Sequence, residues 1–172
     1  MENVPTLNLS QAYGRNREKS NQYLNNETVF LYANQVIKGY FQRGINLVTR
    51  RPGQLADLNT VLLCRQIKNS HYLGIRSVKL DQIQGSEGRS KDFDRFFHSR
   101  QDRTRSRWIT VASARMTGKE LPPIELIQIG EIYFVRDGHH RISVARALGE
   151  KYLDAIITKF EIQPNCQEPC LS

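Results

Sequence analysis

The sequence predicts an α/β (α+β) protein with a small mixed sheet, helices at the edges of that sheet and a helical N-terminal segment. Three patterns lead to this prediction. Apolar and polar residues alternate over residues 75–83, as in a half-buried strand. Two short apolar runs, 124–129 and 132–136, flank a Gly-Glu pair and predict a hairpin. Apolar residues recur at helical spacing after Asn25 and again over residues 139–148.

The length and composition indicate one globular domain with an appendage. The chain has 172 residues, of which 39% are hydrophobic and 24% charged. We divide it into a helical N-terminal segment (1–74), a core (75–163) and a tail (164–172). No apolar run approaches the roughly 20 residues that span a bilayer, and no basic region precedes an apolar core at the N-terminus. We therefore expect a cytoplasmic protein that does not contact a membrane.

Residues 1–24 are polar and carry no sustained hydrophobic period, so we expect them to be loosely held or only partly helical. A helix is predicted from Asn25, with Asn25 or Asn26 as its N-cap and Gly44 at its end. Its apolar residues at helical spacing are Val29, Phe30, Ala33, Val36, Ile37, Tyr40 and Phe41.

A second helix is predicted over residues 55–68, after the break Arg-Arg-Pro-Gly-Gln. Its apolar side carries Leu55, Leu58, Leu62 and Ile67. Since helices that follow one another across a short break commonly pack together, we expect these two to pair.

The middle of the chain combines a strand, a long loop and a helix. The alternating residues 75–83 are followed by residues 84–105, which contain two glycines, many charges and three phenylalanines, and which we interpret as a functional loop with a short helical turn. The next helix is predicted from residue 105 to Gly118. Its inward face consists of Trp108, Val111, Ala112 and Met116.

The last part of the core predicts a hairpin, a helix and a strand. Pro122 and Pro123 precede the hairpin of residues 124–136, and Asp137-Gly138 opens a helix with Gly149 as its C-cap candidate. The inward face of this helix carries Ile142, Ala145 and Leu148. Residues 152–160 predict a final strand.

The start of the last helix is the candidate site. The first N–H groups of a helix lack intrahelical partners and carry the positive end of the macrodipole. His139, His140 and Arg141 crowd three basic groups into that turn. Either the turn is solvated, with one histidine packed, the other exposed and Arg141 on the surface, or it is built around an anion such as phosphate. In the second case, protonation of the histidines should tighten anion binding as the pH falls from 8 to 6.

Other chemistries at this turn are weaker predictions. Adjacent histidines in a helix point about 100° apart, so we predict no metal site here. Ser143 lies one turn inside the helix and lacks a glycine elbow, which disfavours a serine nucleophile.

Cys64 stands alone, and Cys166 with Cys170 form only half of a zinc-ligand set. We expect all three to remain thiols in a reducing compartment.

Residues 75–160 resemble the ParB/sulfiredoxin superfamily. The resemblance rests on the strand Val-Lys-Leu-Asp-Gln-Ile, the strand Leu-Pro-Pro-Ile-Glu-Leu-Ile-Gln-Ile and the segment Gly-Glu-Ile-Tyr-Phe-Val-Arg-Asp-Gly-His-His-Arg. It implies a small mixed sheet of that type. The superfamily includes DNA-binding partition proteins that bind CTP, nucleases, sulfinic acid reductases and small-molecule kinases.

Departures from the family pattern narrow the expected activity. Sulfiredoxins carry Gly-Cys-His-Arg where this chain has Gly138-His139-His140-Arg141, so the catalytic cysteine is absent and sulfinic acid reduction is not expected. Partition-type CTPases carry Gly-Glu-Arg-Arg there, so His139 replaces the glutamate that is implicated in hydrolysis. Those proteins continue into a helix-turn-helix domain, whereas this sequence ends soon after its last strand; we therefore expect any DNA contact to involve the N-terminal helices or the arginine-rich loop.

That loop is the second candidate site. The formal net charge of the chain is +8, which favours polyanionic partners, and residues 86–119 hold nine Lys or Arg against four acids. Arginines interleaved with aromatic residues suit phosphate pairing and base stacking. The alternative is that the aromatics, Phe93, Phe96 and Trp108 above all, anchor the loop in the core. The candidate nucleic-acid-binding residues are Arg89, Arg95, Arg100, Arg103, Arg105 and Arg107.

Three hypotheses of function remain open. The first is a ParB-like nucleic-acid-associated protein that binds DNA or a nucleotide phosphate at Gly138, His139, His140 and Arg141. The second is a nucleotide-dependent enzyme, a nuclease or a small-molecule kinase, that uses a nucleoside triphosphate with Mg²⁺ and has Asp137 or Glu125 as base or metal ligand. The third is a non-catalytic protein whose turn is only structural. A homodimer is compatible with each of them.

Overall fold

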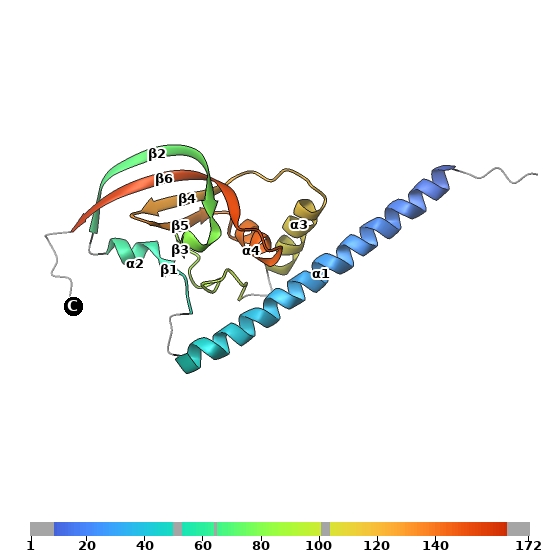
Figure 1. The fold of residues 1–172 in the computed structure, drawn as a ribbon, viewed down its shortest axis with the longest axis horizontal. Helices are drawn as coiled ribbons and strands as arrows, with labels where there is room; N and C mark the ends of the chain where they lie inside the picture. Colours follow the sequence, from blue (N-terminus) through green and yellow to red (C-terminus); the bar gives the residue numbers. More distant parts are fainter. Residues whose placement is uncertain (1–8, 50–52, 64, 101–103, 165–172) are drawn as a thin grey trace, which may run out of the picture.

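The computed structural model describes residues 9–49, 53–63, 65–100 and 104–164. Six strands form one mixed sheet in the order β1-β3-β5-β4-β6-β2, with helices packed around it (Figure 1). The strands are β1 (Ala56–Asp57), β2 (Arg65–Lys79), β3 (Ile83–Ser86), β4 (Ile124–Ile129), β5 (Ile132–Asp137) and β6 (Tyr152–Pro164). The helices are α1 (Leu9–Thr49), α2 (Leu58–Leu62), the 3₁₀ turn η1 (Leu80–Gln82), α3 (Arg105–Met116) and α4 (His139–Ala147). The predicted fold class is confirmed.

The centre of the sheet follows the sequence prediction closely. Strands β4 and β5 form the predicted antiparallel hairpin, with Ile129 paired to Ile132 across the turn. Strand β6 runs parallel to β4 on its other side. Helix α4 connects β5 to β6 and buries Ile142 and Ala145 against the sheet. The amino end of α4 therefore lies where β5 ends.

The predicted helix over residues 55–68 is wrong for most of its length. Of the described residues in this range, only Leu58–Leu62 are helical, after Asp57, whose carboxylate accepts a hydrogen bond from the Asn59 N–H at 2.9 Å. Strand β2 begins at Arg65 and pairs with β6 along its whole length. Because this strand pairing supplies partners for the backbone groups, it outweighs the local helical spacing. The boundary that we set at residue 74 falls inside β2.

Helix α1 is longer than the sequence predicted. It begins at Leu9 instead of Asn25 and continues through Gly44 to Thr49. Asn25 is therefore an interior position and not the N-cap, and its carbonyl accepts a hydrogen bond from the Thr28 hydroxyl at 3.0 Å. The helix is drawn as one continuous rod that extends beyond the body of the molecule (Figure 1).

The predicted pairing of the first two helices is also wrong. Helix α1 packs on α3, where the rings of Tyr32 and Trp108 meet edge to face at 5.5 Å. Trp108 is fully buried, and its indole N–H donates to the Ser143 hydroxyl of α4 at 2.9 Å. The Ser143 hydroxyl therefore has a structural role, which is to connect α4 to α3. Of the predicted inward face of α3, Trp108 and Ala112 are buried.

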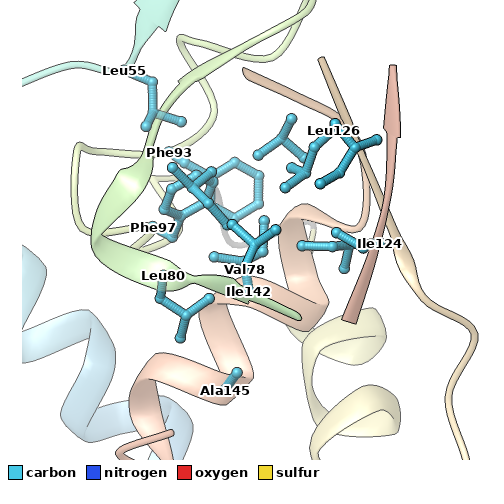
Figure 2. Packing of buried hydrophobic residues seen from close by; sticks show 13 residues of the cluster. Leu55, Val78, Leu80, Phe93, Phe97, Ile124, Leu126, Ile142 and Ala145 are labelled. Carbon is cyan, nitrogen blue, oxygen red and sulfur yellow. The ribbon is translucent and has the colours of Figure 1, made fainter. Parts of the chain in front are cut away.

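The main core lies between the sheet, α4 and the loop that follows β3. Figure 2 shows Phe93 and Phe97 of that loop beside Leu126 and Ile142, with Val78 and Leu80 next to them. Both phenylalanine rings are fully buried. The loop is therefore anchored in the core. For Phe93, this confirms the alternative interpretation, in which the aromatic residues of the loop are core residues and do not stack on bases. None of the described helices has both the length and the apolar character that crossing a bilayer requires.

Candidate functional site

The turn between β5 and α4 requires a glycine. Gly138 is the N-cap of α4 and has a φ of +102°, which L side chains rarely adopt. A Cβ at this position would lie 2.5 Å from Cγ2 of Ile124 on β4. The absent side chain therefore lets the amino end of α4 lie close against β4.

Both histidines of the turn are buried. His139 Nε2 shares a hydrogen bond with the Ser86 hydroxyl at 2.7 Å, and the His139 ring stacks on Phe93 at 5.4 Å. His140 meets the same Phe93 ring edge-on, also at 5.4 Å. Its Nδ1 atom is buried and has no hydrogen-bond partner. Ser86, the last residue of β3, and Phe93, from the loop after β3, thus form the wall that faces the first turn of α4.

Burial changes the protonation of both rings. It lowers the pKa of His139 from 6.5 to about 3, with a further lowering from the charge of Arg89. The pKa of His140 falls to about 4, again mainly through burial and then through Arg89 and Arg107. The rings are therefore neutral between pH 6 and 8, and the expectation that protonated histidines attract the anion over that range is wrong for the ligand-free protein. The predicted exposed histidine is also absent, since both are buried.

Arg141 forms most of its hydrogen bonds within the protein. Its guanidinium donates to the carbonyl oxygens of Pro122 at 2.5 Å and Pro123 at 2.8 Å, and it pairs with the carboxylate of Asp137. These bonds connect the segment before β4 to the start of α4. Asp137 and Glu125, the weak catalytic candidates, are exposed and face each other across the β5–β4 pair. The carboxylate of Asp137 is already paired with the guanidinium of Arg141.

The arginines of the loop do not converge on one place. Arg89 pairs with Asp92 at 2.9 Å, lies over the Phe93 ring and, together with Arg107, acts electrostatically on His140. Arg95 lies over Phe96 and lines a different cavity with Arg146.

The remaining arginines have other surroundings. Arg105 stacks on Tyr32 of α1, and Arg100 is exposed. Arg103 lies outside the described residues. Of the six candidate nucleic-acid-binding arginines, Arg89 and Arg107 are therefore the two that act on the α4 turn.

Sequence reasoning missed the residues that shape the loop. Asp94 is 1% exposed and accepts hydrogen bonds from the backbone N–H groups of Phe96 and His98 and from His98 Nδ1, at 2.8–2.9 Å. Phe97 follows with a φ of +64°, which is unusual for an aromatic residue. The Asp94 bonds hold this strained turn in place and keep Phe93 against His139. An Asp three residues before a Phe-His pair offers only a weak sequence signal for such a turn.

No group of three or more potential metal ligands occurs among the described residues. Cys64, Cys166 and Cys170 lie outside those residues, so the prediction that they are uninvolved thiols stays a prediction.

Comparisons with known proteins show a distant likeness to a solved structure. No family model and no curated protein matches this sequence. Among solved structures, the chain is similar to the crystal structure of sulfiredoxin from Arabidopsis thaliana, with 18% sequence identity and a TM-score of 0.37. The match covers 48% of this chain and 82% of that chain. A likeness of this extent carries no argument about activity.

Proposed function

We propose that the protein binds a phosphate-bearing ligand, a nucleotide or the backbone of DNA, at the amino end of α4. In this proposal it is a nucleic-acid-associated protein of the ParB-like kind, built on a ParB/sulfiredoxin-type fold. The observation that carries the proposal is the buried Nδ1 atom of His140, which has no hydrogen-bond partner at the positive end of a helix. A buried polar atom without a partner is costly, and most such atoms in native proteins are satisfied by protein, water or ligand.

The charges around the turn favour an anion as the partner. Arg89 and Arg107 both lower the pKa of His140, so the local potential is positive. The backbone N–H groups of the first turn of α4 add the positive end of the helix dipole. A neutral His140 ring can donate from Nδ1 to a phosphate oxygen, while Arg89 and Arg107 supply charge.

The wider surface supports a polyanion over a small uncharged ligand. The chain carries a formal net charge of +8. Arg100, Arg105 and Arg107 are exposed on the loop and on the first turn of α3. Exposed arginines away from the α4 turn can contact further phosphates of DNA, whereas a free nucleotide would occupy the α4 turn alone. Asp137, which pairs with Arg141, and Asp92, which pairs with Arg89, are the described carboxylates whose charges act on His139, and either could contact a nucleotide-bound Mg²⁺.

The test replaces Arg89 or Arg107 by alanine. Each substitution should weaken phosphate binding by about 10- to 100-fold, since a charge-assisted hydrogen bond contributes roughly 1.5–3 kcal/mol. Calorimetric titrations with inorganic phosphate, nucleoside triphosphates with and without Mg²⁺, and a DNA duplex separate the possible sources of the phosphate. Because both histidines are neutral and the phosphodiesters of DNA do not titrate in this range, the affinity for the duplex should change little between pH 8 and 6.

Arg95→Ala is the matched control, because Arg95 is equally cationic but lines a different cavity. It should bind as wild type does. The proposal fails if Arg95→Ala weakens phosphate binding as much as Arg89→Ala, or if no phosphate ligand binds at millimolar concentration.

A further inference from the structure

Helix α1 distributes its side chains in the reverse of the usual way. The face that packs against the body buries mostly small or polar residues around one aromatic ring. These residues are Thr28, Tyr32, Gln35, Gly39 and Asn46. A surface helix normally buries its apolar face and exposes its polar face. The body of the molecule accounts for Tyr32, Leu31 and Val36, which pack with Trp108, but not for the other large apolar residues of α1.

The large apolar residues of α1 that are exposed lie mainly on the opposite side of the helix, although Phe41 and Ile45 also line a cavity with Leu80 of the body. We call these exposed apolar residues the α1 stripe. Their exposed fractions range from 51% for Ile37 to 83% for Leu47. At 100° per residue they cluster opposite the buried face. The α1 stripe consists of Tyr23, Phe30, Ile37, Tyr40, Phe41, Ile45 and Leu47.

The spacing of the α1 stripe is typical of a helix that packs against another helix. Tyr23, Phe30 and Ile37 are each seven residues apart, and so are Tyr40 and Leu47. Tyr40 follows Ile37 by three residues, so these five residues share one heptad register, whose remaining seam positions hold Asn26, Ala33 and Gly44. Such a stripe, exposed over six turns of a helix, indicates a missing partner helix.

We propose that the α1 stripe is the interface of a homodimer in which two copies of α1 pack antiparallel. This proposal is independent of the phosphate site. Residues 9–49 carry five basic and two acidic side chains, a net charge of +3 over 41 residues, so α1 is only weakly basic. Anionic lipid surfaces and nucleic acids select strongly basic helices. A second copy of α1 offers the same apolar seam and therefore complements it.

Two charges beside the stripe favour the antiparallel direction. Glu27 and Lys38 are eleven residues apart, close to three full turns, and so lie on the same flank of the stripe. In an antiparallel pair, equal flanks face each other. Pairing centred on the segment from Phe30 to Ile37 then brings Glu27 of one copy near Lys38 of the other, twice. A parallel pair would place this flank against the opposite one, which carries Val29 and Val36.

The exposed area is sufficient for a stable dimer. A buried aromatic side chain removes about 150–250 Å² from water. The four aromatic residues of the stripe are about two thirds exposed and so offer about 400–700 Å² per copy. Ile37, Ile45 and Leu47 extend this toward the roughly 800 Å² per partner of a standard interface.

The experiment measures the mass of the full chain by sedimentation equilibrium over a range of concentrations. Wild type should be dimeric at micromolar concentration. The double variant Phe30→Glu, Ile37→Glu should raise the dimer dissociation constant by at least about 30-fold, since residues at the centre of an interface dominate its affinity. Ile75→Glu makes the same change at a similarly exposed apolar residue on β2 and should stay dimeric. Circular dichroism checks that each variant keeps its helix content.

A charge exchange tests the direction. Glu27→Lys and Lys38→Glu should each weaken the dimer, and the double exchange should restore it. A parallel arrangement would show no restoration. The proposal is overturned if wild type stays monomeric at 100 μM, if the Phe30→Glu, Ile37→Glu variant dimerises like wild type, or if the stripe binds vesicles of anionic lipid as a monomer.

Discussion

Replacing Gly138 by alanine is expected to lower the free energy of unfolding by about 2–6 kcal/mol. Two costs add at this position. The φ of +102° is strained for an L residue, at about 1–3 kcal/mol. The new Cβ would also lie 2.5 Å from Cγ2 and 2.8 Å from Cβ of Ile124. Rotation of the Ile124 side chain relieves the first contact but not the second, so β4 or α4 must move, at a further 1–3 kcal/mol or so.

Gly130→Ala separates these two costs. Gly130 has a φ of +58°, and a Cβ there meets nothing within 4 Å. This control should lose only about 1–2 kcal/mol in urea unfolding, the cost of the backbone conformation alone. Equal losses in the two variants would show that α4 does not approach β4 as closely as the structure has it.

The centre of the fold was predictable because each of its elements is short and has clear boundaries. The hairpin of β4 and β5 follows from two apolar runs around Gly130, and α4 follows from Asp137-Gly138 at one end and Gly149 at the other. In these segments the local pattern and the tertiary packing favour the same structure. Trp108 and Ala112 likewise face inward, as their spacing in α3 predicts.

The segments before residue 75 were predicted less well, because their patterns are ambiguous. Residues 65–68 show helical spacing, but they pair with the far end of β6, nearly 100 residues away in the sequence. That partner is not visible in a local window. In α1, the apolar face that predicted the helix is the face that the body leaves exposed, and the sequence alone cannot distinguish an apolar face for the core from one for another chain.

The sequence predicted the helix start at the candidate site but not the surroundings of its side chains. The Asp-Gly-His-His-Arg turn does form a helix start, as predicted. The sequence did not indicate that Phe93 and Ser86 would bury both imidazoles, nor that Arg141 would be bonded to the carbonyls of two prolines. These features depend on the loop after β3, whose conformation rests on the buried Asp94.

The protein should lose stability steeply as the pH falls from 7.5 to 5. In the folded state the pKa of His139 is lowered to about 3 and that of His140 to about 4, from 6.5 in the unfolded chain. Between pH 6.5 and about 4 the unfolded chain therefore binds more protons than the folded one. The stability that the neutral rings provide is complete above pH 6.5 and declines as the pH falls below it.

The expected loss between pH 7.5 and 5 is about 3–4 kcal/mol for the two histidines together, because each pKa unit corresponds to about 1.4 kcal/mol. Urea unfolding at several pH values measures it, and most carboxylates, which titrate near pH 4, contribute little in this window.

The variant His139→Gln, His140→Gln should be less stable at pH 7.5 but should lose much less stability on acidification. His71→Gln is the control, since His71 is half exposed and pairs with Glu161; it should keep the steep wild-type dependence. If the double variant loses as much stability as wild type between pH 7.5 and 5, the two rings are not held neutral by burial, and the potential that we assign to the α4 turn is wrong.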